Sequence, residues 1–291
     1  ILLKKPEKKE NGEINMKRVD GISKLFDIKN RNIVITGSSG LLGSQYANTL
    51  SAAGANVILV DLDSTKNKKL EYSLVKKYGT KARSYITDIS NPQAVKKLAK
   101  NVLTDFKKID GLVNNAAYTS KGAKEKSDNA FGSFENFPIK IWQKSIDINL
   151  SGVFFCSQAF GKIMVKQGKG VIVNIASTYG LVGADQRIYG KSGLNLPISY
   201  AATKGAIVNL TRYLAAYWSG KNIRVNTLSP GGVLDATYQD KKFIKKYSER
   251  TILGRMARKD EYNGAMLFLI SDASSYMTGA NLIVDGGWTA W

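Results

Sequence analysis

The chain has 291 residues, enough for one large α/β domain that buries its own core without help from metals or disulfides. It contains no histidine, which excludes the Ser-His-Asp triad, the HExxH zinc motif and every histidine proton relay. Its one cysteine cannot form an internal disulfide, no apolar run approaches the roughly 20 residues of a membrane span, and lysines scattered over most predicted helices produce the formal charge of +20. We therefore expect a cytoplasmic protein without a metal site, whose partners include neither nucleic acid nor a membrane.

The first 30 residues differ in pattern from the rest of the chain. Residues 1–30 are polar and lysine-rich and show no clear periodicity, which predicts a basic N-terminal extension that is disordered or loosely packed. From residue 31 onward, short β-branched runs alternate with amphipathic segments, the pattern of repeated βα units around a parallel sheet. We predict a single domain over residues 31–291.

Seven β-branched runs and six amphipathic segments define the predicted elements of this domain. Strands are expected at residues 32–36, 56–60, 82–87, 111–114, 170–175, 224–228 and 282–284. Helices are expected at residues 41–53, 66–77, 92–106, 139–166, 199–220 and 259–270. With right-handed crossovers these elements make an α/β, three-layer, doubly wound Rossmann fold with a seven-stranded parallel sheet, whose ligand crevice lies at the carboxyl ends of the strands.

A glycine-rich turn follows the first predicted strand. The sequence TGSSGLLG at residues 36–43 leads from that strand into an apolar helix, which is the context that a dinucleotide-binding turn requires. Glycines here permit a tight bend, let the backbone approach a pyrophosphate and allow close helix packing, while the helix N-terminus offers free N–H groups. We expect cofactor contacts from Gly37, Ser39, Gly40, Leu42 and Gly43.

An acidic residue ends the second predicted strand. Asp61 follows the glycine turn by about 20 residues, where a carboxylate accepts hydrogen bonds from the adenosine ribose and repels a 2′-phosphate. This position favours NAD over NADP, although Lys66, Lys68 and Lys69 follow closely and keep NADP as the weaker alternative. An ordinary helix cap is the other interpretation of Asp61.

Several motifs appear together in a characteristic order, and on them the chain resembles the classical short-chain dehydrogenase/reductase family from about residue 32 to its C-terminus. They are TGSSGLLG, Asp88-Ile89, NNAA at 114–117, Asn149, Ser177, YAATK at 200–204, SPGG at 229–232 and MTGANLIVDGGWTAW at 277–291. Within that family the chain is most similar to oxidoreductases of flagellin modification and surface-sugar biosynthesis, which share the long insert before Tyr200 and the VDGGWTAW ending.

The resemblance implies a catalytic tetrad. Tyr200 would act as general acid/base, Lys204 would hold the nicotinamide ribose, Ser177 would hydrogen-bond the reacting oxygen, and Asn149 would hold a water of the proton relay. Independently of the family, Tyr200 and Lys204 lie four residues apart on a predicted helix, so an ammonium near the phenol would favour the phenolate. A plain amphipathic helix face is the alternative.

The resemblance also implies the remaining cofactor contacts and the assembly. Asp88 and Ile89 would contact the adenine, Asn115 and Ala116 would border the adenine ribose, and the nicotinamide carboxamide would be held by Pro230, Gly231 and Val233. Asp235 stands where a threonine is often found, the middle glycine falls at 40 instead of 41, and the stretch from Ser177 to Tyr200 is longer than usual. A homo-oligomer, tetramer or dimer, is expected, with Trp288 and Trp291 adding to an interface.

The segments around the predicted pocket are polar. The insert carries Asp185, Gln186, Arg187, Tyr189, Lys191 and Asn195, and the segment after NNAA carries Tyr118, Lys121, Lys124 and Lys126. They favour a polar or anionic small-molecule substrate, and hence an NAD(H)-dependent oxidoreductase that interconverts a secondary alcohol and a ketone on a sugar or sugar derivative. A 3-oxoacyl-carrier-protein reductase, or a basic nucleic-acid- or membrane-binding protein on the same scaffold, are the alternatives.

Overall fold

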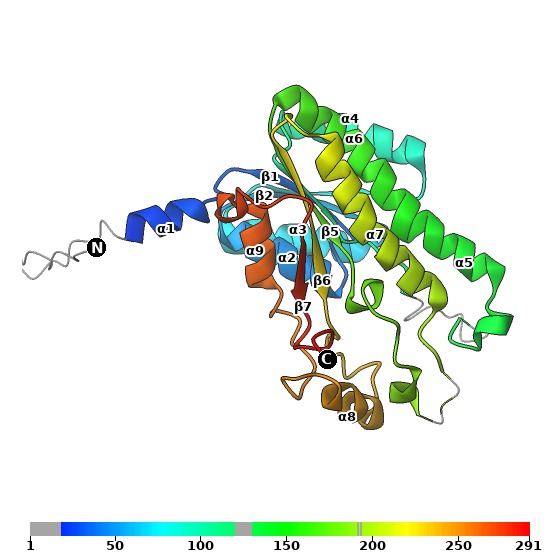
Figure 1. Ribbon diagram of the computed structural model, residues 1–291. Coiled ribbons are helices and arrows are strands. Elements are labelled where there is room, and N and C mark those ends of the chain that lie inside the picture. The colour runs from blue at the N-terminus through cyan, green and yellow to red at the C-terminus, as the bar shows by residue number, and fades with distance from the viewer. Residues whose placement is uncertain (1–18, 120–129, 191, 193) are drawn as a thin grey trace, which may run out of the picture.

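The fold is built on one sheet of seven parallel strands. The computed structural model describes residues 19–119, 130–190, 192 and 194–291. The strands lie in the order β3-β2-β1-β4-β5-β6-β7. Figure 1 shows the chain as a ribbon coloured from its N-terminus to its C-terminus. The strand bounds are β1 Asn32–Thr36, β2 Asn56–Asp61, β3 Ala82–Ile86, β4 Gly111–Asn114, β5 Gly170–Ile175, β6 Ile223–Pro230 and β7 Asn281–Val284. The predicted α/β fold with a seven-stranded parallel sheet is confirmed, and the strand order reverses between β1 and β4, which is where such sheets open a ligand crevice.

Helices cover both faces of the sheet, and alternate residues of each central strand pack against opposite layers. Ile33 and Ile35 of β1 join the cluster under α2 (Leu41–Ala52), α3 (Ser64–Tyr78) and α9 (Asn263–Ile270). Val34 joins the other cluster, under α4 (Pro92–Phe106), α6 (Gly152–Gln167) and α7 (Ile198–Tyr217). Because both faces are covered, β1, β4 and β5 are buried along their whole length, as strands of a doubly wound sheet are expected to be.

The predicted helix 139–166 is interrupted by a wider turn. Helix α5 (Ile139–Ile146) continues into one π-helical turn at Asp147–Ser151 and then into α6. By length and composition the stretch Ile139–Gln167 could cross a membrane, but 44% of its most apolar window is buried inside the molecule. Cys156, Phe160 and Met164 pack in the core, so the apolar character of this helix is explained by its position in the fold.

Three elements differ from the sequence-based predictions. Helix α1 (Val19–Leu25) forms within the predicted extension, and Ile28 is fully buried in the core, so the packed domain reaches beyond the predicted boundary at residue 31. Residues 1–18 of that extension lie outside the described residues. Helix α8 (Lys241–Glu249) was not predicted, and α9 begins at Asn263 rather than at 259. The apolar side chains of α8 pack with Ile188 of the insert and with Trp288 of the C-terminal segment.

Candidate functional site

The predicted site residues gather at the carboxyl edge of the sheet. The turn after β1 carries the glycines, the segment after β4 carries Asn115, Ser177 follows β5, and Gly231 follows β6. Helix α7 brings Tyr200 and Lys204 to the same edge. Parallel strands all end on one side, so residues scattered from 37 to 233 become neighbours.

The glycine turn is held against the segment after β4 by side-chain and backbone hydrogen bonds. The Asn115 amide donates to the carbonyl oxygens of Thr36 and Gly37 at 2.9 and 3.0 Å. The Thr36 hydroxyl accepts from the N–H groups of Asn115 and Ala116 at 3.0 and 3.1 Å. Gly37 has φ of 62°, and a Cβ there would lie 2.7 Å from the Cα of Ala116, so no larger residue fits. Asn115 and Ala116 therefore shape the turn itself, besides bordering the predicted ribose site.

The start of α2 fits an anionic group. Gly40 is the N-cap and provides no side-chain cap, and the first turn carries no acidic residue, so its N–H groups can serve a pyrophosphate. A Cβ at Gly43 would lie 2.1 Å from the Gly37 carbonyl oxygen, which explains the close packing of helix on turn. The Gly40 N–H donates to the Gly37 carbonyl oxygen at 3.1 Å, so the donors that fit a dinucleotide are those of the first turn of α2, from Leu41 onward. The expected cofactor contacts of Gly37, Ser39, Gly40, Leu42 and Gly43 stay predictions.

Asp61 lies at the end of β2, beside the glycine turn. Its carboxylate accepts from the Ser39 N–H at 2.9 Å and from the Asp63 N–H at 3.0 Å, so it is fixed in place and stays partly exposed. The helix-cap role belongs instead to Asp63, which accepts from the Lys66 N–H. Lys66 forms an ion pair with Asp63 at 2.8 Å.

The two residues after β3 have different environments. Asp88 is exposed and its carboxylate accepts from the N–H and hydroxyl of Ser90 at 2.9 and 2.7 Å. Ile89 is buried in the core cluster beneath α4 and α6, where a Cβ on Gly152 would lie 2.7 Å from its Cδ1. Ile89 therefore has a packing role, and its predicted contact with adenine stays a prediction.

Ser177, Tyr200 and Lys204 form a compact group. The side chains of Ser177 and Tyr200 are hydrogen-bonded to each other. The Lys204 ammonium donates to the Ile175 carbonyl oxygen at 2.6 Å and lies 5.6 Å from the centroid of the Tyr200 ring. Lys204 is only 4% exposed, whereas Tyr200 is half-buried and remains open on one side. The three residues are placed as a proton-exchange site requires.

Burial controls both titrating groups of this site. It raises the pKa of Tyr200, and the hydrogen bond with Ser177 partly opposes that rise. Burial lowers the pKa of Lys204 to about 8. The sequence analysis expected the Lys204 charge to lower the pKa of Tyr200, but in the structure the opposing effect comes from Ser177. The ammonium is directed at the Ile175 carbonyl instead.

Asn149 lies within the π-helical turn and is 1% exposed. Its side-chain oxygen accepts from the Tyr118 N–H at 2.7 Å, and its amide donates to the Tyr118 carbonyl oxygen at 3.1 Å and to the Thr203 hydroxyl at 3.4 Å. Asn149 thus ties the segment after β4 to α7. Because its amide is occupied, a water of the predicted relay would need another group of this turn.

Sequence reasoning missed two tyrosines that hold the segment after β6. The Tyr247 hydroxyl accepts from the Gly232 N–H at 2.6 Å and is hydrogen-bonded to the Thr178 side chain. The Tyr262 hydroxyl donates to the Gly231 carbonyl oxygen at 3.1 Å. Pro230 is buried at the end of β6, and Val233 pairs with Ala257. The two tyrosines therefore fix the backbone of the segment that is predicted to hold the carboxamide. In the sequence, only the glycines of SPGG indicated that other groups approach this backbone closely.

The polar residues of the insert are engaged within the protein. Asp185 forms ion pairs with Arg187 at 2.8 Å and with Arg250 at 3.2 Å, while the Gln186 side chain accepts from the Leu196 N–H at 2.8 Å. Asn195 donates through its backbone N–H to the Phe131 carbonyl oxygen at 2.7 Å. The other predicted basic residues, Lys121, Lys124, Lys126 and Lys191, lie outside the described residues.

Aromatic rings line the inner side of the insert. Tyr179 contacts Trp288 edge-on at 6.0 Å, Trp288 stacks on Tyr247 at 4.3 Å, and Tyr189 lies against Phe243 at 5.4 Å. Trp288 is 5% exposed, so the expectation that it adds to a subunit interface is wrong. Helix α8 and the C-terminal segment, which lie near each other in Figure 1, form this wall together with the insert.

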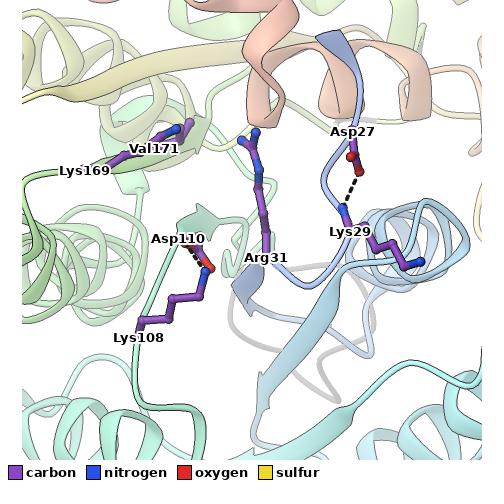
Figure 2. A pocket seen from close by; sticks show the side chains of 7 residues that line it. All are labelled: Asp27, Lys29, Arg31, Lys108, Asp110, Lys169 and Val171. Atoms are coloured by element: carbon purple, nitrogen blue, oxygen red, sulfur yellow. Dashed lines mark hydrogen bonds and ion pairs between the residues drawn. The ribbon is translucent and has the colours of Figure 1, made fainter. Parts of the chain in front are cut away.

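A charged hollow lies at the opposite, amino edge of the sheet. It measures about 380 Å³ and is lined by Asp27, Lys29, Arg31, Lys108, Asp110, Lys169 and Val171 (Figure 2). Six of these residues precede β1, β4 or β5, and Val171 is the second residue of β5, so the hollow is separated from the tetrad by the length of the strands. Among the described residues no group of three potential ligands could hold a metal ion.

Comparisons with known proteins match nearly the whole chain. Residues 38–289 match the model of the family described as enoyl-(acyl carrier protein) reductase. A sorbose reductase of Candida albicans is 33% identical over 270 residues, which cover 91% of this chain and 89% of that protein. A gluconate 5-dehydrogenase from Burkholderia cenocepacia, solved with NADP and tartrate, has a TM-score of 0.82 at 30% identity and covers 93% of this chain and 99% of its own. An NAD⁺-bound xylitol dehydrogenase has a TM-score of 0.78 at 29% identity, covering 89% and 99%.

Proposed function

This chain belongs to the short-chain dehydrogenase/reductase family, and we propose that it is an NAD(H)-dependent oxidoreductase that interconverts a secondary alcohol and a ketone on a sugar or polyol. The observation that carries the proposal is the group of Ser177, Tyr200 and Lys204 at the carboxyl edge, beside an uncapped helix N-terminus that fits a dinucleotide. The cofactor, when bound, supplies hydride exchange with the substrate carbon.

The residues of the chain handle the proton. In the oxidation direction the Tyr200 oxygen takes the proton of the substrate hydroxyl, and in reduction it returns a proton to the carbonyl oxygen. Burial raises the pKa of Tyr200, the hydrogen bond with Ser177 partly opposes that rise, and the Ser177 hydroxyl can hydrogen-bond the same substrate oxygen. We expect Lys204, whose ammonium donates to the Ile175 carbonyl oxygen, to hold ribose hydroxyls with its remaining hydrogens.

The substrate class is supported by the aromatic wall of the insert and by the relatives. The sorbose reductase, the xylitol dehydrogenase and the gluconate 5-dehydrogenase are all named for sugars or polyols. The aromatic wall around Tyr179 and Tyr189 offers flat faces with phenol groups, which suit the C–H face and the hydroxyls of a carbohydrate. The narrower likeness to enzymes of surface-sugar biosynthesis stays a prediction.

Asp61 supports NAD as the cofactor. Two backbone N–H groups hold its carboxylate at the end of β2, where its charge repels a 2′-phosphate. The nearby Lys66 is engaged with Asp63, so it is a poor partner for that phosphate. We expect Asp61→Asn, which removes the charge and keeps an acceptor oxygen, to reduce the preference for NADH over NADPH by about tenfold, measured as the ratio of the two dissociation constants.

A homo-oligomer in the cytoplasm completes the proposal. Tyr213 and Tyr217 stack on each other on the exposed side of α7, and Phe154 of α6 is 45% exposed, so these helices present apolar surface for a second copy. A chain with a single, buried cysteine, Cys156, forms no internal disulfide, which is consistent with a reducing compartment. Native mass measurement that finds only monomer would contradict the assembly.

The first experiment is a fluorescence titration with NADH and NADPH, followed by a turnover screen of polyols, ketoses and an acetoacetyl thioester. NADH-selective binding with polyol or ketose turnover supports the proposal. Turnover of the thioester alone would instead identify a 3-oxoacyl reductase. Absence of binding to either nucleotide, combined with salt-sensitive binding to DNA or anionic vesicles, would favour a basic binding protein on this scaffold.

A further inference from the structure

Two tyrosines of the insert lie beside the proposed catalytic group, and neither belongs to the tetrad. Tyr179 comes two residues after Ser177, and its backbone N–H donates to the Ser177 side-chain oxygen at 3.3 Å. Tyr189 ends the short helical turn Gln186–Tyr189, eleven residues before Tyr200 in the chain. The insert thus begins and ends at proposed catalytic residues, and both phenols lie between them in the chain.

Both rings are held firmly by other aromatic side chains. Tyr179 packs edge-on against Trp288 at 6.0 Å, and Tyr189 packs against Phe243 of α8 at 5.4 Å. The ion pairs of Asp185 with Arg187 and Arg250 fasten the insert from outside. Gly180 leaves no room between the start of the insert and α7, since a Cβ there would lie 2.6 Å from the Lys204 carbonyl oxygen. The two phenols are therefore preorganised and do not swing freely into solvent.

The hydroxyl groups themselves remain available. Neither phenol oxygen has a hydrogen-bond partner within residues 19–119, 130–190, 192 and 194–291, although both residues are half-buried. Neither oxygen is among the fully enclosed polar atoms without a partner, so both can be reached from outside the protein. A partly buried hydroxyl left without a protein partner loses free energy unless a water or a ligand bonds to it.

Both phenols interact electrostatically with Tyr200. Burial, and after it Tyr200, raises the pKa of Tyr189 to about 12. Burial is also the largest cause of the raised pKa of Tyr179, and Tyr247, Tyr189 and Tyr200 add to it. Both phenols are therefore protonated throughout the working pH range. Each can donate one hydrogen bond and accept another, which is what recognition of a substrate hydroxyl requires.

We propose that Tyr179 and Tyr189 are specificity-determining residues that hydrogen-bond the hydroxyl groups of a polyol or sugar beyond its reacting carbon. This inference rests on the proposed function. The proposal predicts which substrates the enzyme selects. A polyol satisfies both phenols. A monohydric alcohol or an acyl chain displaces water from the phenols but leaves them without a hydrogen-bond partner.

The test removes one oxygen at a time. Tyr179→Phe, Tyr189→Phe and the double variant keep the rings and their packing, and Tyr72→Phe, on the exposed side of α3, is the matched control. Turnover is measured with threitol, xylitol and galactitol, and with 2-butanol and cyclohexanol as monohydric alcohols. We expect each single variant to lower kcat/KM about tenfold for the polyol that wild type uses best, and the double variant about 100-fold, with less than threefold change for the monohydric alcohols.

A second readout separates recognition from a structural role. The polyol KM should rise about tenfold in the single variants while the dissociation constant for NADH stays within twofold. An equal loss for polyols and monohydric alcohols, weakened NADH binding, or unchanged polyol kinetics would each overturn the inference while leaving the dehydrogenase assignment intact. A wild-type protein that oxidises no polyol with NAD or NADP would overturn the proposed function and this inference with it.

Discussion

The two edges of the sheet use their polar groups in opposite ways. At the amino edge, Arg31 pairs with Asp272 at 2.6 Å, and Arg224 donates to the carbonyl oxygens of Leu269, Ser271 and Met277. At the carboxyl edge, the buried Lys204 ammonium donates to the Ile175 carbonyl oxygen at 2.6 Å, and α2 begins without a side-chain cap. The polar groups at the amino edge are thus paired within the protein, whereas some of those at the carboxyl edge are left for a ligand.

This difference separates stability from chemistry. A charge whose donors all meet protein acceptors fastens strands to helices but has nothing left to offer a ligand. A lysine buried with a lowered pKa, or a helix N-terminus without a cap, costs folding free energy and gains its partners when cofactor and substrate bind. We therefore expect substitutions at the carboxyl edge to change activity more than stability, and substitutions at the amino edge to do the reverse.

The largest effect is expected for Tyr200→Phe. Removing the proton-exchanging hydroxyl should lower kcat by about 10²- to 10⁴-fold, while the dissociation constant for NADH and the urea midpoint change little, because the ring still fills its place. Steady-state kinetics, NADH fluorescence and urea unfolding measure the three quantities. A variant that keeps a tenth of wild-type turnover would contradict the role of Tyr200.

At the amino edge, Arg224→Met should act on stability alone. The change leaves three carbonyl oxygens without their donor, which should lower the free energy of unfolding by about 2 kcal/mol and leave kcat/KM within twofold. Lys221→Met, at an exposed position before β6, is the control. A large loss of kcat/KM in a variant that is still folded would remove the contrast between the edges.

The pH dependence of stability tests the strain at Lys204. Its pKa is lowered to about 8 in the folded chain, so between pH 8 and the ordinary lysine value of about 10.4 the unfolded chain binds the extra proton. Stability then rises with pH, and wild type should gain about 2 kcal/mol relative to Lys204→Met between pH 7 and pH 9.5. Urea unfolding of both proteins across this range gives the difference; parallel curves would show that Lys204 is not strained.

The sequence predicts the scaffold well because the scaffold depends on local pattern. The short runs NIVIT and GVIVNI are rich in β-branched residues, which favours buried strands, and the structure confirms both. The spacing of Tyr200 and Lys204 puts them on one helical face, whereas Ser177 and Asn149 were predicted from the family resemblance, and the roles of all four stay predictions. The π-helical turn around Asn149 could not be predicted from hydrophobic periodicity. A single wider turn changes the phase of the hydrophobic pattern only in the residues that follow it, so the pattern on each side is still that of an ordinary α-helix. Helix α8 and the polarity of the insert were misjudged for another reason: Asp185 meets Arg250, and Tyr247 meets Gly232, only after the chain has folded.

The smallest effect is expected for Tyr247→Phe, which tests a residue at the carboxyl edge whose polar group is paired within the protein. Its hydroxyl connects α8, the Gly232 N–H and Thr178, so it is a positioning residue for the segment expected to hold the carboxamide. A Cβ at Gly232 would lie 2.3 Å from the tyrosine ring, which shows how closely the two are fitted. Loss of the hydroxyl frees one N–H, so we expect the dissociation constant for NADH to rise about fivefold and kcat to fall no more than that. A change in the free energy of unfolding without a change in NADH binding would show that Tyr247 only stabilises the fold, as Arg224 is expected to do at the amino edge.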